Sequence, residues 1–345
     1  MTKTQHITAR HVVIKSRPDS ALMPEHFEIT ETQLPALKPG EFLICNHILS
    51  LDAGFRQWMN AGASDNYLSE MPLGEAVQSI ILGQVVDSLN EDYPTGVYVV
   101  GRTAWQDYSI ADGSDLMSII DIDNGVSPEQ YLSALGPSGM TAYFGLTGIG
   151  QPTACDTIVV SAAAGGVGSL VGQMAKILGC KTIGLTSSDE KCQWLTTELG
   201  YDIAINYRSA TPLLEQIQQA APDGVDIYFD NVGGEMLDTI MQHLALNARL
   251  VLCGAISQYD ADKDTGIYNL WQLVTKRARA EGFMFSDYVD QYPQASQQLA
   301  QWINDGLLKA PLNLSYGLEA TAQSFCDMLE GKNTGKSLVI LKTPQ

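Results

Sequence analysis

The sequence predicts an α/β protein in which a doubly wound parallel sheet is inserted into a mostly-β domain. Three observations support this. Extended segments with few helices fill the first third, strands alternate with helices between about 156 and 286, and an apolar strand follows near residue 340. The length of 345 residues fits two domains. We expect residues 1–130 plus 308–345 to form the mostly-β domain and residues 131–307 the inserted one.

The mostly-β domain is predicted from short segments separated by turn residues. Candidate strands cover residues 11–16, 27–32, 41–50, 78–87 and 96–102. The pattern changes near residue 127, and helices are expected at 128–136 and 139–147. We expect the strand at 337–341 to return to this domain, which would make the parallel sheet an insertion.

The inserted domain shows a regular alternation of strand and helix. A continuous apolar run at 157–162 is typical of a strand buried on both faces. A helix follows at 166–179 and ends at a glycine. The other expected strands are 181–186, 202–206, 225–230, 248–253 and 279–285, and the other helices are 189–199, 212–220, 234–244 and 286–306.

Composition restricts the possible partners. A net charge of −19 disfavours binding to nucleic acid or to anionic membrane surfaces. The first 18 residues lack the apolar core of a signal peptide, and no apolar run is long enough to span a bilayer. The six cysteines are scattered without a CxxC pair, which is typical of reduced thiols in a cytoplasmic protein.

The strongest motif is Ala162-Ala163-Ala164-Gly165-Gly166-Val167-Gly168, between a predicted strand and a predicted helix. Glycines there permit a tight turn and let backbone N–H groups at a helix N-terminus approach a pyrophosphate. The pattern AxxGxxG is a variant of the Rossmann fingerprint, with alanine in place of the first glycine. It predicts a dinucleotide site formed by Ala162, Gly165, Gly166, Val167 and Gly168; the alternative is a plain tight turn.

The end of the second strand indicates which dinucleotide binds. NAD-binding domains place Asp or Glu there for the ribose 2′-hydroxyl. This chain has Ser187 and Ser188 instead, with Lys191 in the next helix and Arg208 after the third strand. Hydroxyls and cations suit a 2′-phosphate, so NADPH is expected as the cofactor. For Lys191 the alternative is a solvated helix position.

Together with the segments named below, the fingerprint and the end of the second strand resemble those of a family of zinc-independent medium-chain dehydrogenase/reductases. The branch contains leukotriene hydroxydehydrogenases, prostaglandin reductases, plant 2-alkenal reductases and bacterial curcumin reductases. The resemblance spans nearly the whole chain, in the segments 49–52 with Arg56, 140–143, 187–191, 205–207, 229–234, 253–257, 281–283 and 333–336. It implies a GroES-like substrate domain around the Rossmann domain, and a homodimer. Ala53-Gly54-Phe55 departs from the family's usual Pro-Tyr-Met, so the pocket wall is expected to differ.

The resemblance also implies the residues that contact NADPH. Ser187, Ser188, Lys191 and Tyr207 would lie at the adenosine 2′-phosphate, and Asn231 along the nicotinamide ribose or the diphosphate. A core position is the alternative for Tyr207, and a strand-ending turn is the alternative for residues 231–234. The other implied cofactor residues are Thr141, Cys253, Gly254, Ala255, Ile256, Phe283 and Asn333.

The ligand pattern of zinc-dependent family members is missing from the sequence. There is no catalytic Cys with a His-Glu pair and no four-cysteine lobe, and Gly74-Glu75 lacks a histidine between the two residues. Oxidation of an alcohol normally uses a Lewis acid, so the pattern favours reduction of an activated C=C bond. The predicted reaction transfers hydride from NADPH to the β-carbon of an α,β-unsaturated ketone or aldehyde, without a metal.

The enolate oxygen formed in this reaction needs a hydrogen-bond donor. The donor is either the ribose 2′-hydroxyl of the cofactor or a tyrosine, and water or the tyrosine protonates the α-carbon. Tyr259 and Tyr268 are the candidates, with ordinary packing as the alternative for each. Arg56 would hold either a substrate carboxylate or Asp52. Loops 59–71 and 259–270 are expected to line the substrate pocket.

Three other functions fit the same motifs. A quinone reductase shares the fold and cofactor and differs in its acceptor. A non-catalytic NADPH sensor would retain the nucleotide site without turnover. A zinc-independent alcohol dehydrogenase would oxidise alcohols with NADP⁺.

Overall fold

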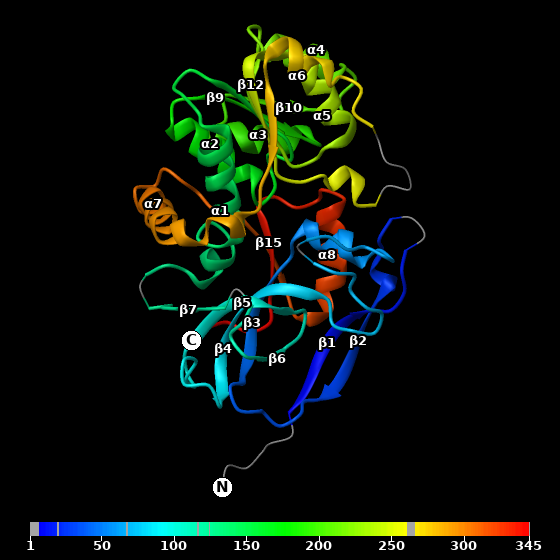
Figure 1. Ribbon diagram of the computed structural model, residues 1–345, viewed down its shortest axis with the longest axis vertical. Helices are drawn as coiled ribbons and strands as arrows, with labels where there is room; N and C mark the ends of the chain where they lie inside the picture. Colours follow the sequence, from blue (N-terminus) through cyan, green and yellow to red (C-terminus); the bar gives the residue numbers. More distant parts are fainter. Residues whose placement is uncertain are drawn as a thin grey trace. The chain divides into compact units, whose positions relative to one another are not determined.

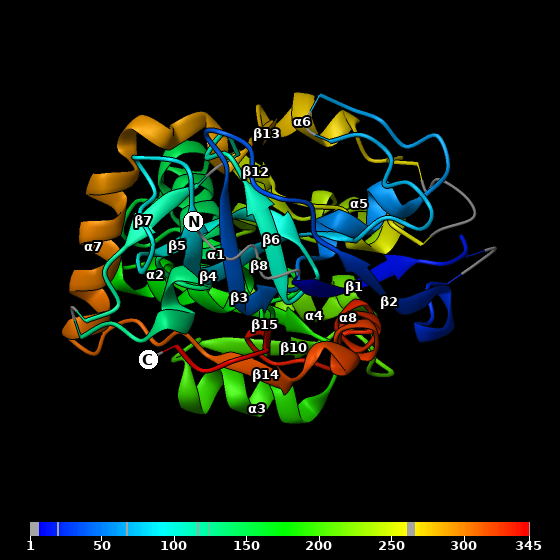
Figure 2. The same cartoon turned by 90° about the horizontal axis from the view of Figure 1, so that it is seen from below.

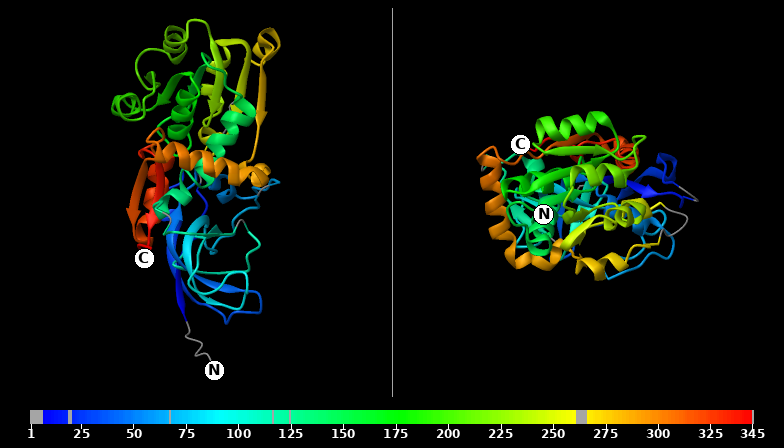
Figure 3. Two further views of the ribbon diagram at one scale, coloured as in Figure 1. Left: turned by 90° about the vertical axis from the view of Figure 1, so that its left-hand side faces the viewer. Right: turned by 90° about the horizontal axis from the view of Figure 1, so that it is seen from above.

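The computed structural model describes residues 7–18, 21–66, 68–115, 117–123, 125–260 and 266–344. The chain divides into two compact units. The first comprises residues 1–132, 313–332 and 337–345, and the second comprises residues 133–312 and 333–336. In Figure 3 the blue-to-cyan and red parts of the ribbon belong mainly to the first unit, and the green-to-orange parts to the second.

The division differs from the expected one in the C-terminal part of the chain. Residues 308–312 and 333–336 belong to the second unit, although all of 308–345 was expected in the mostly-β domain. The reason is a set of backbone contacts. Gly335 N donates to Ala164 O at 2.7 Å, Gly335 forms a parallel bridge with Gly165, and Lys336 N donates to Pro311 O at 2.9 Å.

The second unit is built on a parallel sheet. Its strands are β8 (Thr157–Val160), β9 (Lys181–Thr186), β10 (Ile203–Asn206), β11 (Val225–Asp230), β12 (Leu244–Leu252) and β13 (Arg279–Gly282). Within the described residues they are arranged in the order β10-β9-β8-β11-β12-β13. Counted along the chain this is 3-2-1-4-5-6, the order of a Rossmann domain. The predicted fold class is therefore confirmed.

Helices cover both faces of this sheet (Figure 1). Ile158 and Val160 of β8 pack into one apolar cluster, whereas Val159 packs into another on the opposite face. This is why the strand shows an unbroken apolar run. The first cluster includes residues of α1 (Pro137–Phe144), α2 (Gly168–Ile177), α3 (Asp189–Glu198) and α7 (Tyr292–Asn304), and the second includes residues of α4 (Leu213–Ala220), α5 (Gly234–Met241) and α6 (Trp271–Lys276).

Several predicted helices were wrong in detail. The helix expected at 286–306 is broken: a 3₁₀ segment, Phe285–Gln291, contains Tyr288 with non-helical φ −112° and ψ 19°, and α7 begins after it. Residues 128–136 contain a 3₁₀ turn, Pro128–Leu132, and no α-helix. The helix expected at 139–147 is α1, and it continues as a π-helix, Gly145–Gly150.

The first unit contains a sheet in the order β14-β15-β3-β4-β5-β7, within the described residues. Its strands are β3 (Phe42–Ser50), β4 (Gln78–Ser88), β5 (Tyr98–Ala104), β7 (Ser118–Ile120), β14 (Leu312–Tyr316) and β15 (Lys336–Ile340), and β6 (Tyr108–Ala111) also pairs with β3. β15 runs antiparallel to β3, with Val339 opposite Leu49. The short strands β6, β7 and β14 were not predicted.

A hairpin and a helix complete the first unit. The hairpin is β1 (Thr8–Ile14) with β2 (Phe27–Gln33), and the helix is α8 (Thr321–Leu329) (Figure 2). The buried Trp105 ring contacts Phe27 of the hairpin at 5.7 Å and Phe325 of α8 at 5.0 Å between ring centroids. One aromatic residue therefore packs against both. None of the described helices has the length and apolar character needed to cross a membrane.

Candidate functional site

Most of the predicted cofactor residues lie at one edge of the parallel sheet. The carboxyl ends of parallel strands meet at one edge, and ligands of doubly wound sheets bind where the strand order reverses. Here that position lies between β8 and β11. The fingerprint at 162–168 follows β8, and Asn231 follows β11.

The fingerprint forms a tight turn between β8 and α2. Ala162 has a left-handed backbone, with φ +46°, which ends the strand earlier than the predicted residue 162. Its carbonyl accepts a hydrogen bond from Gly165 N at 2.9 Å. A Cβ at Gly168 would lie 2.4 Å from Ala162 O and 2.8 Å from Ala163 Cα, so glycine is required there. The start of α2 is therefore held close to β8, a geometry that suits a pyrophosphate.

Lys336 is a residue at the fingerprint that sequence reasoning missed. A Cβ added to Gly166 would lie 3.2 Å from Lys336 Cδ and 3.3 Å from its Cα, so the lysine stem passes directly over this glycine. The Lys336 side chain is buried. The signal available in the sequence was its position three residues after Asn333, in a segment already assigned to the cofactor.

The predicted 2′-phosphate residues surround the end of β9. Ser188 Oγ accepts from Lys191 N at 3.3 Å and caps α3. The Lys191 ammonium donates to the carbonyl of Asn333, so the structure brings these two residues together. Arg208 lies over the Tyr207 ring at 5.8 Å. Burial, and then the Arg208 charge, lower the pKa of Lys191, and an anion bound beside the two cations would offset that repulsion.

Asn231 connects the loops that follow β8 and β11. Its side chain donates to Ser161 O at 2.7 Å, and its backbone N donates to Ser161 Oγ at 2.8 Å. The preceding Asp230 is buried and accepts hydrogen bonds from Tyr228 Oη and the amides of residues 232 and 233 at 2.9–3.0 Å. Burial raises the pKa of Asp230 despite these bonds. Sequence reasoning missed Asp230 as the residue that shapes this turn.

Residues 253–256 run beside the same turn. The amides of Cys253 and Gly254 donate to Asp230 O at 2.8 and 3.1 Å, and Ile256 N donates to Asn231 O at 3.3 Å. Burial raises the pKa of the Cys253 thiol to about 12, which keeps it protonated.

Two more predicted cofactor residues lie within the second unit. Phe283 follows β13, and its ring would lie 2.6 Å from a Cβ at Gly145. Glycine is therefore required at the junction between α1 and the π-helix. Thr141 lies half-buried on α1.

The candidate catalytic residues differ in their surroundings. The Tyr259 hydroxyl accepts a hydrogen bond from Ala255 N at 3.3 Å, and burial raises its pKa. Tyr268 is 84% exposed, and its backbone amide donates to Asp238 at 2.7 Å. In the first unit, Arg56 is buried and donates to Asn60 Oδ1 at 2.7 Å; Asn60 directly follows the 3₁₀ helix Ala53–Met59 that contains Arg56.

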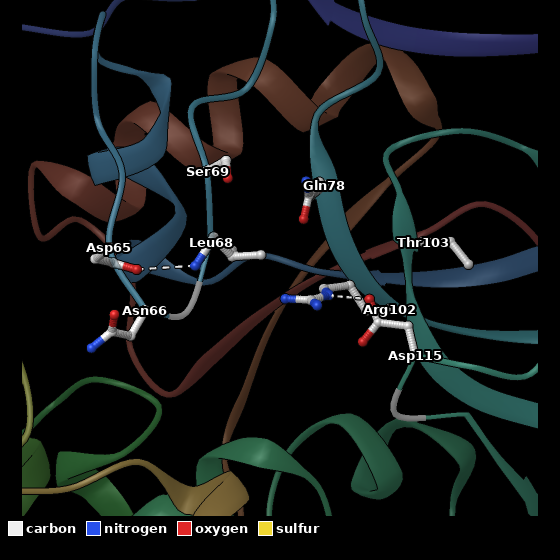
Figure 4. Close-up of a pocket in the computed structure, with 8 residues that line it drawn as sticks. All are labelled: Asp65, Asn66, Leu68, Ser69, Gln78, Arg102, Thr103 and Asp115. Carbon is white, nitrogen blue, oxygen red and sulfur yellow. Dashed lines mark hydrogen bonds and ion pairs between the residues drawn. The ribbon is translucent and has the colours of Figure 1, made fainter.

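The first unit also contains a pocket of about 530 Å³ (Figure 4). Asp65, Asn66, Leu68 and Ser69 line one side, and residues of β4, β5 and the segment after β6 line the other. Within the described ranges, no three His, Cys, Asp or Glu side chains are grouped in a way that could hold a metal ion.

Comparison with known proteins identifies the family. Residues 10–119 match the family described as N-terminal domain of oxidoreductase, and residues 166–301 match the family described as zinc-binding dehydrogenase. The NADPH-dependent curcumin reductase of Escherichia coli is 35% identical over 96% of this chain and 96% of its own. The NADP(+)-dependent 2-alkenal reductase of Nicotiana tabacum is 33% identical over 98% of each chain.

Solved structures agree with these relatives. The structure of CurA from Vibrio vulnificus in complex with NADPH superposes with a TM-score of 0.90 at 37% identity, over 97% of this chain and all of that one. The chain therefore belongs to the zinc-independent medium-chain dehydrogenase/reductases, in the branch that contains the curcumin and 2-alkenal reductases.

Proposed function

We propose that this protein is an NADPH-dependent reductase of the C=C bond of α,β-unsaturated ketones and aldehydes. The observation that carries the proposal is the half-buried Lys191 with Arg208 beside it, at the strand end where NAD-binding domains carry a carboxylate. Full-length relatives named for curcumin and 2-alkenal reduction support the substrate class.

The fingerprint and its neighbours fit the proposed cofactor. Gly165 and Gly168, at the start of α2, would hold the pyrophosphate, and Lys191 with Arg208 would hold the 2′-phosphate. When bound, NADPH supplies the hydride that reaches the β-carbon of the substrate. Of the two candidate tyrosines, Tyr259 has its hydroxyl held at the 253–256 segment. Its raised pKa keeps it protonated and able to donate.

We further propose a homodimer formed through β13. The residues of this edge strand are exposed, and α6 presents Trp271 and Val274 at 68% and 59% exposure. An exposed edge next to large apolar side chains is suited to pairing with a second copy. A molar mass of one chain by light scattering would contradict the dimer.

We also propose a cytoplasmic location. It agrees with the six cysteines, all of them in the described residues, which form no disulfide.

The decisive assay follows NADPH absorbance with enones, 2-alkenals and quinones, with NADH in parallel. We expect enones and 2-alkenals to be reduced and Lys191→Ala to raise the KM for NADPH about 10- to 100-fold, the value of one lost charge-assisted contact. The KM for NADH should stay unchanged. Lys176→Ala, on the exposed side of α2, is the matched control. Turnover of quinones alone would refute the proposal.

A further inference from the structure

Two carboxylates lie next to the cations of the candidate 2′-phosphate site. Asp189 and Glu190 are the first two residues of α3, directly after Ser187 and Ser188. Both acids are exposed, and Lys191 follows them in the same turn. A carboxylate next to a 2′-phosphate would repel it, whereas NAD-binding domains use a carboxylate in this region to accept from the ribose 2′-hydroxyl. The direction in which each acid points therefore affects which dinucleotide binds.

The direction of the Asp189 side chain is set by Asn206, the last residue of β10. Asn206 Nδ2 donates a hydrogen bond to Asp189 Oδ1 at 2.8 Å. β10 runs parallel to β9, and Asn206 lies opposite Thr186, the last residue of β9. The carboxylate is therefore held toward the end of β10, the strand next to the one that leads into Ser187 and Ser188.

The same amide also fixes the backbone at Arg208. Asn206 Oδ1 accepts from Arg208 N at 3.0 Å, which closes an Asx turn. Tyr207 N donates to Thr186 O at 3.1 Å, so this turn stays against the end of β9. A side chain that donates to a carboxylate and accepts from a backbone amide must carry both kinds of group, as Asn does. An ionised Asp at this position would only accept, and an aliphatic residue would do neither.

Glu190, the other acid, is held by its own helix. Hydrogen bonds from its own backbone amide and from the Ser188 hydroxyl lower the pKa of Glu190. A negative charge in the first turn of a helix also interacts favourably with the helix dipole. Asp189 is therefore the acid whose direction depends on a neighbouring strand.

We propose that Asn206 is a specificity-determining residue, which favours NADPH over NADH by holding the Asp189 carboxylate at the end of β10. The inference rests on the proposed function and concerns its choice of cofactor. A carboxylate released from Asn206 would pair with Arg208 or Lys191 and compete with the 2′-phosphate for these cations. It would also be available to the ribose 2′-hydroxyl of NADH, as in NAD-binding domains. Loss of Asn206 should therefore weaken NADPH binding and leave NADH binding equal or stronger.

The test measures the Kd of NADPH and of NADH by titrating the fluorescence of the reduced nicotinamide, with no enone present. Asn206→Ala should lower the ratio of the Kd for NADH to the Kd for NADPH about three- to tenfold, as an exposed charged pair that involves a doubly charged phosphate provides. Asn206→Ser should have the same effect, because its shorter hydroxyl still accepts from Arg208 N and does not reach Asp189. The serine variant also provides the test if Asn206→Ala does not fold.

Removal of the Asp189 charge separates the two contacts of Asn206. In the background of Asp189→Asn, Asn206→Ala should leave the ratio of the two Kd values unchanged, because no carboxylate remains to compete. An equal loss in both backgrounds would mean that Asn206 acts only through Arg208, and would overturn the proposal. The matched control is Gln301→Ala. It removes an exposed amide–carboxylate hydrogen bond of 3.1 Å to Asp305, at the end of α7, and should keep the wild-type ratio.

The titration also distinguishes this inference from the proposed reaction. If NADPH binds but no enone or 2-alkenal is reduced, the proposed reaction fails, and the ratio of the two Kd values still tests Asn206. If the wild-type protein binds NADPH and NADH with equal Kd values, Asn206 has no preference to set and the inference is overturned. Reduction of enones with both cofactors alike would then leave the proposed substrate class standing.

Discussion

His47 is a buried histidine whose protonation should destabilise the protein in acid. It lies on β3 with 2% exposure, and both ring nitrogens lack a hydrogen-bond partner within the described part of the chain. Its ring meets Tyr98 edge-on at 5.6 Å. Burial, followed by the charge of Lys342, lowers its pKa from 6.5 to about 4. At about 1.4 kcal/mol per pH unit, the cost of this burial reaches about 3 kcal/mol at low pH.

The sign follows from the two protonation states. Above pH 6.5 the imidazole is neutral in both the folded and the unfolded chain and adds no pH dependence. Between pH 6.5 and 4 the unfolded chain takes up a proton that the folded chain excludes, so the free energy of unfolding falls. Below pH 4 both states bind the proton and the effect stops growing.

Urea unfolding of wild type and His47→Leu at pH 7.5, 5.5 and 4.5 measures this effect. The variant keeps an apolar side chain at the site and has no group to protonate. The free energy of unfolding of the variant relative to wild type should rise by about 2–3 kcal/mol between pH 7.5 and 4.5. His11→Gln, on the β1–β2 hairpin, is the control for a general effect of histidine removal. A difference that does not change with pH would refute the reasoning.

The nucleotide site yields three further predictions. Gly168→Ala should cost about 1–3 kcal/mol of stability in urea unfolding, because its Cβ would meet the backbone of residues 162 and 163; Gly54→Ala, whose nearest neighbour lies at 3.9 Å, should cost less. Ala162→Gly should raise the melting temperature slightly, because relief of up to about 1–2 kcal/mol of left-handed strain exceeds the added unfolded-state entropy. A lower melting temperature would contradict this. Lys336→Met should raise the KM for NADPH and for NADH alike, because the lysine stem lies over Gly166 of the fingerprint. Lys191→Ala, in contrast, should raise the KM for NADPH alone.

The parallel sheet can be predicted from sequence because its signals are local. Burial on both faces requires the continuous apolar run of β8, and the turn into α2 requires Gly168. The break at Tyr288 has no such signal. Its ring stacks on Phe144 at 4.5 Å, a contact between residues far apart in the chain. Sequence periodicity alone continues a helix through that position.

The residues of the candidate site likewise fall into those that the sequence predicts and those that only the fold brings together. The fingerprint can be predicted from its own glycines, whereas Lys336 reaches Gly166 only because Gly335 pairs with Gly165. Those pairs are made by backbone atoms, which leave no side-chain pattern. The pocket in the first unit depends on the register of β4 and β5, which sets the face from which Arg102 projects. A shift of one residue would direct it to the opposite face.

Residues 333–340 have a consequence for the order in which the protein can fold. Gly335 completes contacts of the second unit, and β15 lies between β14 and β3 in the first. During synthesis both units therefore wait for the same late stretch of chain to leave the ribosome. Until then the edge of β3 that later pairs with β15 is exposed and can pair with strands of other chains. Proteolytic cleavage between α8 and Asn333 would cut the covalent link to the segment that completes both units.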